Sequence, residues 1–129
     1  EGQFTVSFPR PTQVVISSLA ASPRCEDDSK PALSSLATRP ASHVDGVLVG
    51  DCYLYLECRL HSCVDGFGAN SLIIGSVVAA SADEDYLRMA DRDEGEQLVG
   101  APLLAYISPG RYTEIRQTAQ FPLPKGFSR

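Results

Sequence analysis

Two glycines just before a long apolar run have the most suggestive spacing in this chain. Gly66 and Gly68 resemble the start of a dinucleotide-binding fingerprint, in which the backbone N–H groups of a glycine-rich loop contact phosphates. In that fingerprint the loop opens a helix and a third glycine follows. Here a strand-like segment follows and the third glycine is missing. The spacing therefore predicts a hairpin turn, in which the two glycines supply positive φ angles.

The side chains that commonly act as nucleophiles or metal ligands are few and lack a characteristic spacing. The chain has four cysteines and no Cys-x-x-Cys pair, and its only histidines are His43 and His61. Cys52 and Cys58 are expected to be small buried side chains, because both fall on the apolar positions of one predicted strand. The 16 acidic residues show no spacing typical of a carboxylate pair or a calcium loop. We therefore predict no metal site, and no catalytic residue can be named.

The predicted turn, residues 63–69, joins the two segments that we expect to form the longest strands. Apolar and polar residues alternate over residues 51–61, which is the period of a strand with one face on a core. Residues 70–80 are apolar on both parities, so the second strand should lie inside a barrel or at a subunit interface.

Shorter elements are predicted before this hairpin. Residues 3–8 alternate and are rich in strand formers, so they predict a strand. Pro11 is expected to open a helix that ends near Ala21. A second short helix is expected over residues 30–37, and residues 38–50 are expected to be irregular.

The segment after the hairpin begins with a charged connection, residues 82–96, for which we expect a short helix around residues 86–89. The apolar residues 98–107 are expected to be helical after Pro102. Pro109 and Gly110 predict a turn, and a short final strand should follow it. The expected strand is residues 111–115, and residues 121–129 should form an extended tail that packs on the body or on a second subunit.

Composition limits the class of protein. The length of 129 residues fits a single domain, residues 1–129. The net charge of −5 argues against nucleic acid and anionic membrane surfaces as partners. No apolar run is long enough to span a membrane and no signal peptide is visible, so with its reduced thiols we expect a cytoplasmic protein. Many short strands and few helices favour a β-barrel.

Three stretches, taken in their order and spacing, carry a resemblance to a known family. Residues 56–60 (Leu-Glu-Cys-Arg-Leu) with residues 71–78 look like its paired barrel strands, and residues 2–9 look like the strand before its first helix. Residues 102–107, with residues 110–112 and the Phe-Pro-Leu-Pro of residues 121–124, look like its C-terminal segment. The chain thereby resembles the flavin reductase-like proteins, the FMN-binding split-barrel group that includes flavoredoxin and the reductase partners of two-component monooxygenases.

The resemblance implies a mainly β fold, a Greek-key split β-barrel with a few short helices, and a homodimer that holds FMN between its subunits. The flavin would accept a hydride from NADH or NADPH and pass electrons to an acceptor such as a monooxygenase component. Family members carry further strands before the segment that matches residues 2–8, so we expect the chain to be N-terminally incomplete or shortened. The alternative to an oxidoreductase is therefore a non-catalytic dimeric split-barrel module that has lost its flavin site.

The resemblance also suggests which residues bind the cofactor. Asn70 takes the place of a histidine that family members often carry near the flavin, and asparagine forms hydrogen bonds but cannot titrate near neutral pH. Ser29 and Lys30 fall in a loop that approaches the flavin in relatives, although a helix N-cap followed by a surface lysine is the alternative. Arg111 and Tyr112 match a turn near the cofactor. Arg111 could pair with phosphate and Tyr112 could stack on a ring, or the tyrosine could pack in the core.

Overall fold

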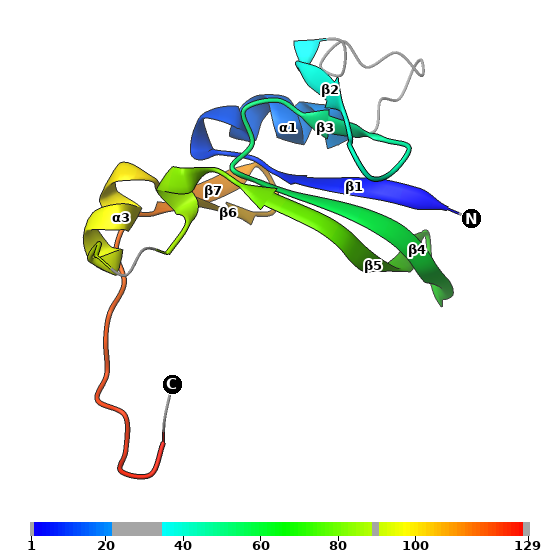
Figure 1. The fold of residues 1–129 in the computed structure, drawn as a ribbon. Coiled ribbons are helices and arrows are strands. Elements are labelled where there is room, and N and C mark those ends of the chain that lie inside the picture. The colour runs from blue at the N-terminus through cyan, green and yellow to red at the C-terminus, as the bar shows by residue number, and fades with distance from the viewer. Residues whose placement is uncertain (1, 22–34, 89–90, 128–129) are drawn as a thin grey trace.

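An antiparallel three-stranded sheet forms the centre of the molecule (Figure 1). The computed structural model describes residues 2–21, 35–88 and 91–127. In the sheet, β4 (Leu54–Phe67) lies between β1 (Gln3–Phe8) and β5 (Asn70–Ala82). Two separate two-stranded sheets are formed by β2 (Thr38–Pro40) with β3 (Val47–Val49) and by β6 (Leu103–Ile107) with β7 (Arg111–Ile115). The predicted mainly β class is confirmed, and β1 and β7 have the predicted bounds.

The helical elements are short. The 3₁₀ turn η1 (Pro11–Gln13) leads directly into α1 (Val14–Ala21), which confirms the helix predicted to begin at Pro11. The second 3₁₀ turn is η2 (Glu84–Tyr86), and α3 (Glu94–Gly100) follows it. The helix predicted around residues 86–89 is wrong, because η2 ends at Tyr86 and residues 87 and 88 are not helical. The helix predicted over residues 30–37 lies mostly outside the described residues.

The helix predicted after Pro102 is also wrong, because Leu103–Ile107 is the strand β6. It pairs residue by residue with β7 across the turn at Pro109 and Gly110. Pairing with β7, which begins at Arg111 just after the turn, decides the conformation of this apolar segment, which local propensity alone leaves open. The helix of this region, α3, lies before Pro102 and not after it. The Asp93 side chain caps α3 by accepting hydrogen bonds from Gly95 N at 2.8 Å and Glu96 N at 3.2 Å. The expectation that residues 38–50 are irregular is likewise wrong for β2 and β3.

The central hairpin is longer than predicted. β4 continues to Phe67, so only Gly68 and Ala69 separate it from β5, and the predicted turn over residues 63–69 is wrong in its bounds. Gly66 and Gly68 do have positive φ angles, 106° and 69°, as the turn prediction required. Irregularities in the β4–β5 register let β4 bend as it runs, and one of them falls between Glu57 and Cys58.

β5 lies at the edge of the sheet and is exposed on both faces. Its neighbours in sequence Leu72 and Ile73, which point to opposite faces, are 52% and 61% exposed. Val77 and Val78 repeat this pattern further along the strand. The described residues therefore do not bury β5 inside a barrel. The other alternative, a subunit interface, stays a prediction.

The core lies between the sheet and the elements on one side of it, α1 and the β2–β3 hairpin (Figure 1). Leu48 on β3 is its most buried large side chain, with 1% of its surface exposed. Cys52 and Cys58 are buried as predicted, and burial raises the pKa of the Cys52 thiol. A raised pKa keeps that thiol protonated and unreactive near neutral pH.

Arg10 joins three segments at one end of the sheet. Its guanidinium forms an ion pair with Asp83, just after β5, and its Nε donates a hydrogen bond of 2.9 Å to the Asp51 carbonyl oxygen. The guanidinium also lies 5.1 Å from the centre of the Tyr86 ring, which stacks on Tyr53 at 4.4 Å. Burial lowers the pKa of Arg10, but Asp83 and Tyr86 outweigh that effect and raise it. The cluster fixes the chain after β1 against the ends of β4 and β5.

Glu57 is a buried carboxylate on β4, at a position where the alternation predicts a polar, wet residue. That expectation is wrong because the loop between β2 and β3 covers this face of β4. Thr5, which pairs with Glu57, donates a hydrogen bond to the Val47 carbonyl oxygen on the same side. The Glu57 carboxylate accepts hydrogen bonds from the backbone N–H groups of Ser42 at 3.2 Å and His43 at 2.5 Å, and the His43 ring lies 3.6 Å away. Burial acts to raise the pKa of Glu57, but these donors outweigh it and hold the pKa below its usual range.

Acidification is expected to remove the stability that Glu57 contributes. Because the folded-state pKa is lowered, the contribution is fully present above the ordinary glutamate pKa of about 4.3 and is lost as the pH falls through the lower folded-state value. Glu57→Gln should lower the free energy of unfolding at neutral pH and flatten its decline in acid. Urea unfolding followed by circular dichroism between pH 3 and pH 7, about the range in which carboxyl groups titrate, measures both effects.

The matched control for Glu57→Gln is Glu84→Gln, which removes an exposed carboxylate from η2. This control should leave the stability and its pH dependence nearly unchanged. An equal loss in both variants would contradict the role given to the buried carboxylate.

Candidate functional site

An apolar groove runs between α1 and the β6–β7 hairpin. Two adjoining cavities form it, one of about 210 Å³ and a wider one of about 400 Å³, and both are lined by Val14, Ser18 and Tyr106. The residues that complete its walls are Pro9, Val15, Ser17, Leu19, Ala21, Leu104, Gly110 and Tyr112. None of these lining side chains is charged, so the groove suits a flat or extended apolar group.

Two tyrosines stand on the hairpin side of this groove. Tyr106 and Tyr112 are paired across β6 and β7, and they are 52% and 48% exposed. The Tyr106 hydroxyl oxygen accepts a hydrogen bond of 3.0 Å from Gly110 N, which fixes the ring against the turn. Tyr112 lines the narrower cavity. The structure therefore places this predicted site residue in an open groove and not in the core, which was the alternative. Sequence reasoning missed Tyr106, although its place beside the turn was a signal.

Arg111 precedes Tyr112 on β7, so its side chain points to the opposite face of that strand. It forms no ion pair with any residue that the structure describes. By contrast, four other arginines pair with carboxylates: Arg10, Arg88, Arg92 and Arg116. Arg111 thus keeps an exposed guanidinium on the face of β7 opposite Tyr112, next to the hairpin turn, where it can bind an anion.

Asn70 lies elsewhere in the chain. It is the first residue of β5, paired with Phe67 at the far end of the β4–β5 hairpin, and it is exposed. Figure 1 shows this end of the hairpin well away from β6 and β7. One chain does not bring Asn70 together with Arg111 and Tyr112. The other two predicted site residues, Ser29 and Lys30, lie outside the described residues.

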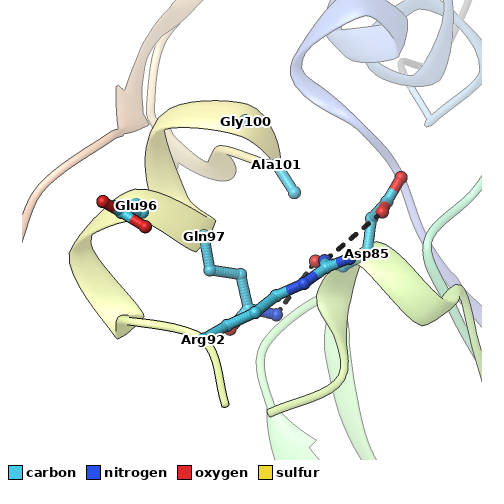
Figure 2. Close-up of a pocket in the computed structure, with 6 residues that line it drawn as sticks. All are labelled: Asp85, Arg92, Glu96, Gln97, Gly100 and Ala101. Atoms are coloured by element: carbon cyan, nitrogen blue, oxygen red, sulfur yellow. Dashed lines mark hydrogen bonds and ion pairs between the residues drawn. The ribbon is translucent and has the colours of Figure 1, made fainter. Parts of the chain in front are cut away.

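A second, polar pocket of about 330 Å³ lies between η2 and α3 (Figure 2). Arg92 extends across it toward Asp85, and the Arg92 Nη1 to Asp85 Oδ1 distance is 3.7 Å. From α3, the Gln97 side-chain amide donates hydrogen bonds to the carbonyl oxygens of Asp85 at 2.9 Å and Leu87 at 2.7 Å. These contacts hold the charged connection against the helix. From the sequence alone, only a charged, solvated connection was predicted here, and these contacts were not.

Two further observations concern the described residues as a whole. Across residues 2–21, 35–88 and 91–127, no three or more His, Cys, Asp or Glu side chains are grouped closely enough to hold a metal ion. No helix in the same part of the chain is long and apolar enough to cross a membrane.

The sequence matches one family model, described as the flavin reductase like domain, over residues 1–115. No curated protein matches the chain.

Three solved structures illustrate the likeness of fold. A putative flavin reductase with a split barrel domain from Shewanella frigidimarina has a TM-score of 0.73 at 14% identity, over 95% of this chain and 61% of its own. Flavoredoxin of Desulfovibrio vulgaris has a TM-score of 0.61 at 25% identity, over 96% and 62%. Nitrilotriacetate monooxygenase component B from Bacillus cereus has a TM-score of 0.64 at 20% identity, over 92% and 58%. The predicted split-barrel class is confirmed, and this chain spans about three fifths of these proteins' length.

Proposed function

Because the chain belongs to the flavin reductase-like domain family, we propose that it binds FMN as part of an NADH- or NADPH-dependent flavin oxidoreductase. The family match over residues 1–115 carries this proposal, since it covers every described strand and helix. When bound, FMN would accept the hydride from the nicotinamide, so the chain's own residues need only bind and orient it.

The donor set of the described residues fits FMN. The isoalloxazine ring needs an apolar or aromatic surface, and the exposed face of Tyr112 in an uncharged groove offers one. The phosphate needs a cation in a chain whose net charge is −5, and Arg111 has an exposed guanidinium with no ion pair among the described residues. Arg111 would hold the phosphate next to the hairpin turn while Tyr112 contacts the ring, so the bound flavin would pass around the edge of β7 from one face to the other. Ser29 and Lys30 remain proposed contacts.

A flavin that contacts both Asn70 and Tyr112 needs two copies of the chain. The two residues lie at separate ends of the molecule, and β5, which begins at Asn70, has apolar side chains exposed on both faces. We therefore propose a homodimer that buries part of β5 and places Asn70 of one copy near Tyr112 of the other. The Asn70 amide would donate or accept a hydrogen bond at the flavin, but it would not supply a proton. A monooxygenase component is one candidate electron acceptor.

Flavin absorbance tests the proposal directly. Titration of the purified protein with FMN should give a saturable change in the flavin spectrum, and anaerobic NADH or NADPH should then bleach it. The mass measured by light scattering should be that of a dimer. Saturable binding without bleaching would remove the reductase activity from the proposal. A folded dimer that does not bind FMN would instead support the non-catalytic module.

Two variants locate the flavin on the chain. Tyr112→Leu should weaken FMN binding by about tenfold through loss of the aromatic contact. Arg111→Gln should weaken binding of FMN but leave binding of riboflavin, which has no phosphate, nearly unchanged. Fluorescence titration with both flavins measures these affinities. Thr113→Ala, the next position on β7, is the matched control, and an equal loss there would contradict the assignment.

A further inference from the structure

The C-terminal tail carries apolar side chains that are largely exposed on its own chain. Residues 116–127 contain no helix or strand and extend away from the rest of the molecule (Figure 1). Phe121 and Phe127 are 73% and 72% exposed, and Leu123 between them is also exposed. Aromatic side chains that are this exposed on one segment indicate a surface that binds a partner molecule.

The tail is suited to bind as an extended strand of chain. Pro122 and Pro124 have a fixed φ and lack an N–H group, so the segment between them favours the polyproline II conformation over helix or sheet. Residues 117–124 contain no charged side chain, whereas 27 of the 129 residues of the chain are charged. Such proline-rich segments dock into grooves lined by aromatic side chains, because little conformational entropy is lost on binding.

The wider part of the groove between α1 and β6 has the matching properties. Its volume is about 400 Å³, its lining has no charged side chain, and Tyr106 supplies an exposed aromatic wall. Ser17 on α1 lies opposite, where its hydroxyl group can donate to a carbonyl oxygen of an extended chain. Tail and groove therefore agree in shape and in their lack of charge.

Contacts at the start of the tail direct it away from its own groove. The Arg116 guanidinium donates a hydrogen bond of 3.2 Å to the Val99 carbonyl oxygen and forms an ion pair with Glu114. Residues 118–121 then pass the start of α3, where Glu94 lines a small cavity with them. From there the tail runs away from α1 (Figure 1).

We propose that the tail of one copy, residues 120–124, docks into the groove between α1 and β6 of a second copy. Phe121 and Leu123 fill the apolar floor, and Pro122 and Pro124 keep the chain extended along Tyr106. Exchange of tails in both directions buries the two exposed side chains and the groove of each copy. The proposal stands apart from flavin binding, because Tyr112 lines the narrower cavity, which the tail leaves open.

Disulfide trapping between two variants of the full chain tests this docking. Ser17→Cys places a thiol in the groove, Leu123→Cys places one in the tail, and Cys25→Ser with Cys63→Ser removes two native thiols from both variants. The two proteins are mixed and oxidised, and non-reducing electrophoresis should show a cross-linked dimer only when both are present. Adding Phe121→Ser to the tail variant should lower the yield by about tenfold. Gln117→Ser is its matched control and should not lower it.

Each other outcome overturns the proposal. No cross-link in the mixture means that the tail does not reach the groove. A cross-link that forms within one chain when Ser17→Cys and Leu123→Cys are combined, and stays within it at high protein concentration, means that the tail binds its own copy. An equal yield when Ser76→Cys on β5 replaces Ser17→Cys means that the contact is non-specific. Far-UV circular dichroism of each variant confirms that the fold is retained.

Discussion

Replacing Gly75 with valine is expected to lower the free energy of unfolding by about 1–3 kcal/mol. Gly75 lies in β5 opposite Leu60 of β4, and the Phe4 ring from β1 reaches across β4 to cover it. A Cβ atom at this position would lie 2.6 Å from Phe4 Cε1 and 3.2 Å from the Arg59 carbonyl oxygen. The valine must therefore displace the ring that connects the first strand to the last strand of the sheet. Urea unfolding followed by circular dichroism measures the loss.

Ser76→Val is the matched control for Gly75→Val, because residue 76 is the next position on β5 and is exposed. It should change the stability by less than about 0.5 kcal/mol. Phe4→Leu should recover part of the loss in the Gly75→Val background, since the shorter side chain leaves room for the methyl groups. A double-mutant cycle without coupling between residues 4 and 75 would show that the contact with the ring is not the cause.

Leu48→Ala is expected to cost about 2–5 kcal/mol, the second large effect on stability. Leu48 on β3 is 1% exposed and lies in a core that includes Val14 from α1 and Val44 from the loop between β2 and β3. Because these buried side chains come from short elements, few neighbours can move to fill the cavity that alanine leaves. This loss is a large fraction of the free energy of unfolding of a small domain, which is about 5–15 kcal/mol. The thermal unfolding transition should therefore broaden or disappear.

The neighbouring residue on the same strand gives the comparison for Leu48. Val47 is 56% exposed, so Val47→Ala should change stability by no more than about 0.5 kcal/mol. Its carbonyl oxygen, which accepts a hydrogen bond from the Thr5 hydroxyl, is retained in the alanine variant. Similar losses at positions 47 and 48 would mean that the β2–β3 hairpin is held by its backbone contacts and not by the buried leucine.

Much of the fold could be predicted because its local signals agree with its tertiary contacts. The alternation in residues 3–8 and the strand after Gly110 correspond to β1 and β7, and the proline before α1 marks the start of the helical segment. The two glycines of the β4–β5 turn required positive φ angles, which the structure shows. In each of these cases, residues within the segment itself or next to it determine its backbone conformation.

The remaining elements depend on partners that a local pattern does not contain. Leu103–Ile107 becomes a strand because β7 pairs with it. Glu57 is buried because the loop between β2 and β3 covers its face of β4 and supplies two backbone N–H groups. The groove could not be foreseen either, since α1 and β6 are about 80 residues apart in the sequence, beyond the reach of any periodicity.

Some residues of the candidate site could be predicted from the sequence, but their arrangement in space could not. Tyr112 does line the groove, and Arg111 precedes it on β7 with its side chain on the other face. Asn70 lies at the far end of the β4–β5 hairpin, a separation that sequence order did not indicate. Residues that act together across two copies of a chain leave no spacing signal in either copy.

The position of β5 at the edge of the sheet has a consequence for aggregation of the chain. Among the described residues only β4 pairs with it, so one side of a 13-residue strand offers its N–H and C=O groups to any extended chain. From Asn70 to Ala82 there is no lysine, glutamate or proline to act as a gatekeeper against such addition. A newly made copy is therefore a template for cross-β aggregation until this edge is covered. Production yield of the isolated chain should therefore fall as its concentration rises, because exposed β5 edges then meet one another more often.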